Sequence, residues 1–134
     1  MNNDEVVNTT SKYIVKSTGI GFETGQKMIE TTNGFGAENL EGGDTDSLVS
    51  LIECYYIIES IGSTAGKLTI SAAAAYDPQA DAAGTAVKKE LTLTNSGKYG
   101  LRPEQLKFGN DRQFTLTTDS NVRNYLLVTE FRRN

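Results

Sequence analysis

The residue types that most often carry enzyme chemistry are scarce in this chain of 134 residues, which contains no histidine and one cysteine, Cys54. Without histidine, neither a Ser-His-Asp triad nor a Cys-His pair can form, and no imidazole can bind zinc. One cysteine also excludes an internal disulfide and a multi-cysteine metal site. Because Cys54 lies in an apolar run beside Glu53 and has no basic neighbour, we predict a buried and unreactive thiol.

Three acidic residues, Glu41, Asp44 and Asp46, lie close together in a glycine-rich stretch. Calcium binds carboxylate oxygens, but it needs about six to eight oxygen ligands, and the ligand spacing of an EF-hand is absent here. We therefore predict no metal site, and cation binding by this acidic loop is kept as an alternative.

Two glycine-containing stretches share only part of the pattern of a phosphate-binding loop. In residues 19–25 (GIGFETG), the third glycine comes one position later than the dinucleotide-binding fingerprint requires. In residues 65–68 (AGKL), no serine or threonine follows the lysine, as a P-loop requires. We interpret both stretches as turns, and we predict no catalytic residue, no cofactor and no enzymatic activity.

The balance of charge argues against a nucleic-acid partner. The chain has 13 Lys and Arg against 17 Asp and Glu, with a sequence pI of about 4.8. A nucleic-acid-binding domain usually carries an excess of basic residues instead. The acidic excess lies in residues 1–67, with four basic and ten acidic residues, whereas residues 68–134 have nine and seven. Regions of opposite charge could support head-to-tail contact between copies.

Hydropathy predicts neither a membrane partner nor secretion through a signal peptide. The most apolar stretch, Leu48–Ile61, contains Glu53 and Glu59 and is too short to span a bilayer. Residues 1–5 (MNNDE) lack the basic start and the apolar run of a signal peptide. We therefore expect the protein to remain in the cytoplasm or to assemble there into something larger.

Short runs of alternating apolar and polar residues, separated by turn residues, dominate the rest of the chain. In Lys67–Ala73, for example, Leu68 and Ile70 alternate with polar neighbours, which is typical of a half-buried strand. Sixteen threonines also favour strands. Further strands are predicted at Thr9–Lys16, Gln26–Thr31, Val87–Thr94, Gln113–Thr118 and Tyr125–Arg132.

The run Leu48–Ile61 fits two kinds of element. As a helix it would have Asp46 or Ser47 as N-cap and Gly62 just after its end. As a strand it contains residues 55–58 (YYII), which have high β preference and low helix preference. We favour the strand and keep the helix as an alternative. Residues 95–97 (NSG) are predicted to form a hairpin turn.

Seven or eight strands at a spacing of roughly ten residues predict an all-β fold, a single-domain β-sandwich over residues 9–134. We favour jelly-roll topology for this sandwich. Residues 1–8 are polar, and we predict that they form a flexible N-terminal arm that orders on contact with a partner.

Three segments support a comparison with a known class of protein. They are residues 11–21 (SKYIVKSTGIG), the run 48–61 after its glycine-rich acidic loop, and residues 125–132 (YLLVTEFR). This histidine-free β domain, rich in Thr, Gly and Ala, resembles the small virion structural proteins of tailed phages, and most of all their capsid decoration (cement) proteins. The resemblance implies a sandwich or jelly roll, often trimeric, that binds the major capsid protein on the outer capsid lattice and stabilises the shell.

Following this resemblance, we predict a non-enzymatic homo-oligomer, with a trimer favoured, located in the virion and assembled in the host cytoplasm. The resemblance supplies no binding residues, because no defined motif matches. Two other functions stay open: a structural component of the phage neck or tail, and a carbohydrate-binding module that stacks Tyr55, Tyr56 or Tyr76 on a sugar. Since the chain has no tryptophan, we interpret these tyrosines as core or interface residues. An enzyme ranks last, because without histidine it would have to rely on carboxylates, lysine or tyrosine.

Overall fold

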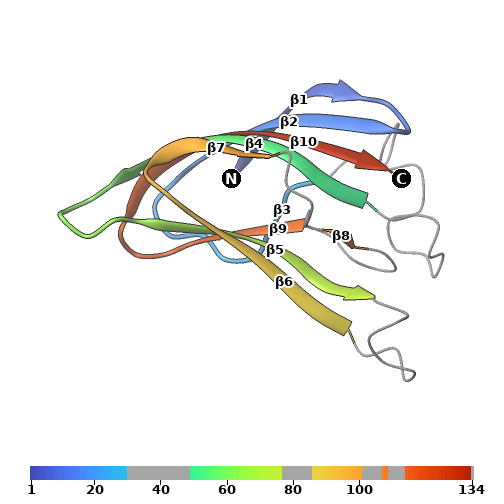
Figure 1. Cartoon of the computed structure of the whole chain (residues 1–134). Coiled ribbons are helices and arrows are strands. Elements are labelled where there is room, and N and C mark those ends of the chain that lie inside the picture. The colour runs from blue at the N-terminus through green and yellow to red at the C-terminus, as the bar shows by residue number, and fades with distance from the viewer. Residues whose placement is uncertain (30–48, 77–85, 101–106, 109–113, 134) are drawn as a thin grey trace.

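A computed structural model of the chain describes residues 1–29, 49–76, 86–100, 107–108 and 114–133. In these ranges every regular element is a β-strand, and the strands form two antiparallel sheets that face each other (Figure 1). The prediction of an all-β fold is therefore confirmed. Across the same ranges, no helix is long and apolar enough to cross a membrane.

Sheet A is the larger of the two sheets, and its strands other than β8 form the upper layer in Figure 1. Its strands lie in the order β1 (Asn2–Asn8), β2 (Lys12–Ile20), β10 (Val122–Arg133), β4 (Val49–Ser60) and β7 (Ser96–Gly100), and β8 (Lys107–Phe108) also pairs with β4. Sheet B has the order β3 (Gln26–Lys27), β9 (Phe114–Thr118), β5 (Lys67–Tyr76) and β6 (Ala86–Thr94).

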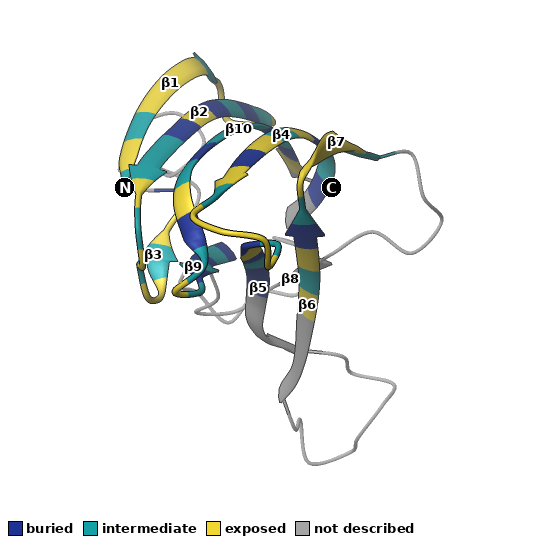
Figure 2. Cartoon of the chain, turned by 90° about the vertical axis from the view of Figure 1, so that its left-hand side faces the viewer, coloured by how far each residue is buried: buried dark blue, intermediate teal, exposed yellow. Residues whose placement is uncertain are grey.

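The core lies between the two sheets and follows from the period-two alternation along their strands (Figure 2). The ring of Phe131 on β10 lies 4.8 Å from that of Phe114 on β9, and 6.4 Å from that of Tyr13 on β2. The contact with Phe114 joins sheet A to sheet B, and the contact with Tyr13 lies within sheet A. The largest fully buried side chains are Tyr13, Phe114, Phe131, Met28, Ile29, Leu51, Leu68, Ile70, Leu116 and Leu127.

The run Leu48–Ile61 is a strand, as favoured, because β4 covers Val49–Ser60 between β10 and β7. Its apolar residues are divided between two faces: Cys54 and Ile58 are buried, whereas Tyr55 and Ile57 are exposed. The run therefore lacks a simple alternation because both faces of this strand carry apolar side chains.

Residues 1–8, predicted as a flexible arm, contain strand β1, which pairs with β2 at the edge of sheet A. The side chain of Asn3 donates a hydrogen bond of 3.1 Å to the carbonyl of Lys27 and accepts one of 2.7 Å from the Ser17 hydroxyl. Polar and charged residues with an irregularity between Glu5 and Val7 are common on edge strands, where they oppose aggregation. The polar composition from which we predicted an arm is therefore the composition of an edge strand that is protected against aggregation.

The hairpin predicted at residues 95–97 is wrong, because β6 and β7 lie in different sheets. Asn95 does turn the chain, with a positive φ of 62° that asparagine tolerates. Its carbonyl accepts a hydrogen bond of 2.6 Å from the amide of Ile58, so the chain leaves sheet B there and joins β4 in sheet A.

Candidate functional site

Large apolar side chains are exposed on the larger sheet and on the segments next to it. Among the described residues, the large apolar side chains that are between 50% and 82% exposed all belong to sheet A or to the segments directly continuing its strands. They are Val6, Ile20, Phe22, Tyr55, Ile57 and Ile61. Exposed apolar side chains that gather on one surface mark interaction sites, whereas scattered ones need no explanation.

The outer face of sheet A, meaning the face turned away from the core, is built from register-paired rows. Residues directly opposite each other on antiparallel strands place their side chains on the same face. The middle row crosses β1, β2, β10, β4 and β7, and consists of Asp4, Lys16, Val128, Tyr55 and Lys98. We call it the central row.

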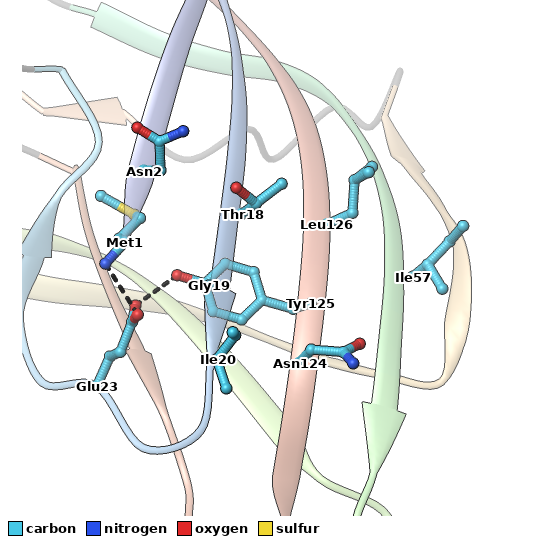
Figure 3. A pocket seen from close by; sticks show the side chains of 10 residues that line it. All are labelled: Met1, Asn2, Thr18, Gly19, Ile20, Glu23, Ile57, Asn124, Tyr125 and Leu126. Atoms are coloured by element: carbon cyan, nitrogen blue, oxygen red, sulfur yellow. Dashed lines mark hydrogen bonds and ion pairs between the residues drawn. The ribbon is translucent and has the colours of Figure 1, made fainter.

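A second row, next to the central row, is polar at its ends and apolar in its middle. It crosses the same five strands and consists of Asn2, Thr18, Leu126, Ile57 and Ser96. Figure 3 shows Thr18, Leu126 and Ile57 on three neighbouring strands. The apolar middle of both rows thus lies over β10 and β4, and polar residues surround it.

Two hollows open next to these rows. The larger has a volume of about 840 Å³ and contains Thr18, Leu126 and Ile57 of the second row among its lining residues (Figure 3). The smaller has a volume of about 110 Å³ and is lined by Ile14, Glu53, Tyr55, Val128 and Glu130. Side chains of a bound molecule could fill both hollows.

A polar contact joins residues that line the larger hollow. Glu23 accepts a hydrogen bond from the Tyr125 hydroxyl and forms an ion pair of 2.9 Å with the amino group of Met1 (Figure 3). Burial raises the pKa of Tyr125 above its ordinary value, and the Glu23 carboxylate raises it further. The Tyr125 ring lies directly over Gly19, where a Cβ atom would overlap it. Gly19 therefore lets this aromatic side chain cross from β10 over β2.

Charged residues beside Tyr55 are paired with each other. The Lys98 ammonium lies 2.6 Å from the Glu53 carboxylate and 5.1 Å from the centre of the Tyr55 ring. The hydrogen bond from Lys98 lowers the pKa of Glu53, and the same contact raises the pKa of Lys98. On the neighbouring strand, Glu130 is paired with Arg132 at 2.8 Å. These ion pairs place charged side chains around the apolar middle of the outer face of sheet A.

Cys54 is buried, as predicted from its apolar surroundings. Burial raises the pKa of its thiol to about 11, and the Thr129 hydroxyl lies 3.5 Å from the sulfur. The thiolate, which is the nucleophilic and metal-binding form, is therefore scarce at neutral pH.

The other residues singled out in the sequence do not form one site. Tyr55 is exposed on the outer face of sheet A, whereas Tyr56 packs against the core, so the two rings lie on opposite faces of β4. The side chain of Tyr76 and the acidic loop with Glu41, Asp44 and Asp46 lie outside the described residues. Within the described part of the chain, no group of three or more His, Cys, Asp and Glu could hold a metal ion.

The sequence predicted both glycine-containing stretches as turns, and the structure agrees in part. Gly21 and Gly25 lie in the connection between β2 and β3 and have positive φ angles of 74° and 57°. Gly66 lies directly before β5, with Val122 packed against it. Gly19 and Ile20, in contrast, belong to β2.

Sequence reasoning missed the rows on sheet A. Asp4, Lys16 and Lys98 come from three distant segments, and register alone brings them together. One signal was present: β10 is apolar at Leu126 and Val128 as well as at the buried Leu127. Apolar residues at both odd and even positions of a strand are typical of a strand that is covered on both faces.

Comparison with known proteins adds no relative. No protein-family model matches this chain, and searches of curated proteins and of solved structures found no match.

Proposed function

We propose that this chain is a non-enzymatic structural protein of a virion, which binds the outer capsid lattice as a decoration protein and stabilises the shell. The observation that carries this proposal is the gathering of exposed apolar side chains on sheet A and the segments that continue its strands. A protein that acts by assembly needs such a contact surface and needs no reactive group.

The strand order supports a single-domain β-sandwich with jelly-roll topology. Without β1 and β8, the sheets have the orders β2-β10-β4-β7 and β3-β9-β5-β6. When these eight strands are renumbered from one to eight along the chain, sheet A has the order 1-8-3-6 and sheet B has the order 2-7-4-5. This alternation between two four-stranded sheets is the one that a jelly roll of two Greek keys produces.

The physics of decoration fits a surface of this kind. A capsid offers many equivalent sites, so modest contacts are strengthened when linked copies bind together. We accordingly propose the major capsid protein as partner, a homo-oligomeric state, and assembly in the host cytoplasm. The net charge of −4 disfavours a role on the packaged nucleic acid. The trimer rests on the resemblance alone, and it competes with the two-fold contact that we infer below.

The test is the composition of virus particles produced by the source that encodes this chain. Density-banded particles are analysed by mass spectrometry, and particles lacking the gene serve as the control. We expect the chain in the particle band in proportion to the major capsid protein, and a lower temperature of genome release without it. Absence from the band would contradict the proposal. A few copies per particle would favour the neck or tail component instead.

A further inference from the structure

We infer that a second copy of this chain packs on the outer face of sheet A, around a two-fold axis that runs along β10. This contact deepens the proposed function and rests on it for the expectation that copies assemble. In a two-fold contact each residue of one copy meets a residue of the other, and the reverse contact is made as well.

The central row is complementary to its own reversal. From β1 to β7 it reads acidic, basic, aliphatic, aromatic and basic, and a two-fold axis along β10 reverses this order in the second copy. Asp4 then faces the second copy's Lys98 at each edge, where this lysine, already paired with Glu53 of its own copy, lies between two carboxylates. Lys16 faces the second copy's Tyr55, which is a cation–π pairing. Val128 lies on the axis and meets its own counterpart.

The second row matches itself in the same way. Its polar ends, Asn2 and Ser96, face each other across the contact, and Leu126 meets its counterpart on the axis. The methyl group of Thr18 comes over the second copy's Ile57. The result is an apolar centre with a polar rim, which is the usual composition of a protein interface.

The row beside the central row, which contains Ile14, Glu130 and Glu53, matches its own reversal only in part. Glu53 on β4 is in register with Glu130 and, through it, with Ile14 on β2. The two-fold axis therefore places Glu53 over the stretch of β2 between Lys12 and Lys16 in the second copy. Glu53, which is already paired with Lys98 of its own copy, thus lies near two lysines of the other copy, whereas Glu130 on the axis meets its own counterpart and is balanced there by its ion pair with Arg132.

Two charges of the central row are still unpaired in one copy. Within the described part of the chain, neither Asp4 nor Lys16 forms an ion pair. Their side chains are exposed. A second copy would give both charges an opposite or aromatic neighbour, and placing like charges there would be unfavourable.

The face has the dimensions of a dimer contact. With strands about 4.8 Å apart and about 3.4 Å per residue, five strands and the length of β2 cover roughly 600 Å². Stable interfaces bury about 800 Å² of accessible surface per partner, which exceeds the flat footprint because side chains interdigitate. An axis along β10 keeps the two copies of this strand parallel, which lies within the range of up to about 30° in which aligned sheets pack.

Sedimentation velocity over a range of protein concentrations tests the contact. We expect a species of about 29 kDa, twice the 14.5 kDa of one chain. Val128→Arg places two like charges on the axis, and it should raise the dissociation constant at least a hundredfold. The matched control is Thr92→Arg, at an exposed position of sheet B, which should leave self-association unchanged.

Two further variants keep the inference testable if Val128→Arg misfolds. Asp4→Lys lies on the exposed edge strand and would face the second copy's Lys98, so we expect a roughly tenfold weaker dimer at low salt. Val128→Cys should be cross-linked to a dimer by a short bismaleimide, and Thr92→Cys should not. Cys54 is buried and will not compete.

Three results would overturn the inference. They are a wild-type chain that stays monomeric up to about 1 mM, a trimer, and a dimer that none of the sheet A variants weakens. The virion experiment is independent of these outcomes. A dimer that is absent from particles would contradict the proposed function alone, and a particle-bound monomer or trimer would contradict the two-fold contact alone.

Discussion

The outward positions of the two sheets carry different side chains. On sheet B, Thr69 lies opposite Thr92 on β6 and Thr117 on β9, so hydroxyl groups form the corresponding outward row among the described residues. On sheet A, the corresponding middle positions are Val128, Leu126 and Ile57. The inward positions of both sheets are alike, with apolar side chains that meet in one core.

This difference separates the requirements of folding from those of assembly. A sheet with one solvated face needs apolar residues only on its inner side, and the described side chains of sheet B have this pattern. Sheet A has the same inner side and an apolar centre on its outer side as well. Since the fold does not need that second apolar surface, we assign it to contact with other molecules.

The largest expected effect comes from the inner faces, which the two sheets share. Phe131→Ala removes the ring that contacts Tyr13 and Phe114, and we expect the free energy of unfolding to fall by about 3–5 kcal/mol. Urea denaturation at a fixed protein concentration measures this change. Thr92→Ala on sheet B is the control and should change stability by less than about 0.5 kcal/mol. Equal effects would contradict the division into inner and outer faces.

A smaller loss of stability is expected where Tyr125 crosses Gly19. Gly19→Ala should push the Tyr125 ring away from Glu23, because a Cβ atom at this position overlaps the ring. We expect a loss of about 1–3 kcal/mol. Gly62→Ala is the matched control, since no atom lies within 4 Å of a Cβ built there. An unchanged denaturation midpoint for Gly19→Ala would show that Tyr125 does not hold this end of sheet A.

Alkaline pH should weaken the inner face of sheet A. Burial raises the pKa of Cys54 from 9.0 to about 11, and it also raises the pKa of Tyr125. A pKa that is raised in the folded state means that the stabilisation is complete below pH 9 and is lost as the pH rises toward 11. We expect a loss of roughly 2 kcal/mol between these values. Cys54→Ala should reduce this loss, and a flat pH profile for the wild type would contradict the burial of both groups.

The smallest effect on stability, but a clear one on association, is expected from exchanging side chains between the two outer faces. Ile57→Thr gives sheet A a threonine, and Thr92→Ile gives sheet B an isoleucine. Each should change the free energy of unfolding of one chain by less than about 1 kcal/mol. Ile57→Thr should weaken self-association roughly tenfold, and Thr92→Ile should not weaken it. Light scattering at several concentrations separates the two, and a weaker dimer for Thr92→Ile would contradict the assignment of the surface.

Local patterns in the sequence predicted most of the strands. The alternation of Leu68 and Ile70 with polar residues is visible in the sequence and defines both the strand and its buried side. The run 55–58 was harder to assign because Tyr55 and Ile57 are apolar without being buried. The residues that obscured this element are thus the ones that belong to the candidate surface.

Relations between distant segments could not be predicted from one sequence. Asn95 indicates a turn, but the pairing of the next strand depends on β4, some forty residues earlier. The central row likewise depends on four strand pairings at once, and a shift of one residue in any of them would move its side chains to the other face. The pairing of β1 with β2 depends on contacts such as that of Asn3 with Ser17, which leave no periodic pattern.

Radical footprinting at low and high protein concentration tests most directly whether the outer face of sheet A is a contact surface between copies. The rates of side-chain oxidation are compared for Tyr55 and Ile57 on sheet A and for the partly exposed Leu91 on sheet B. We predict that Tyr55 and Ile57 become protected as concentration rises, while Leu91 reacts at an unchanged rate. Equal rates at all concentrations for Tyr55 and Ile57, or protection of Leu91 alone, would contradict the account.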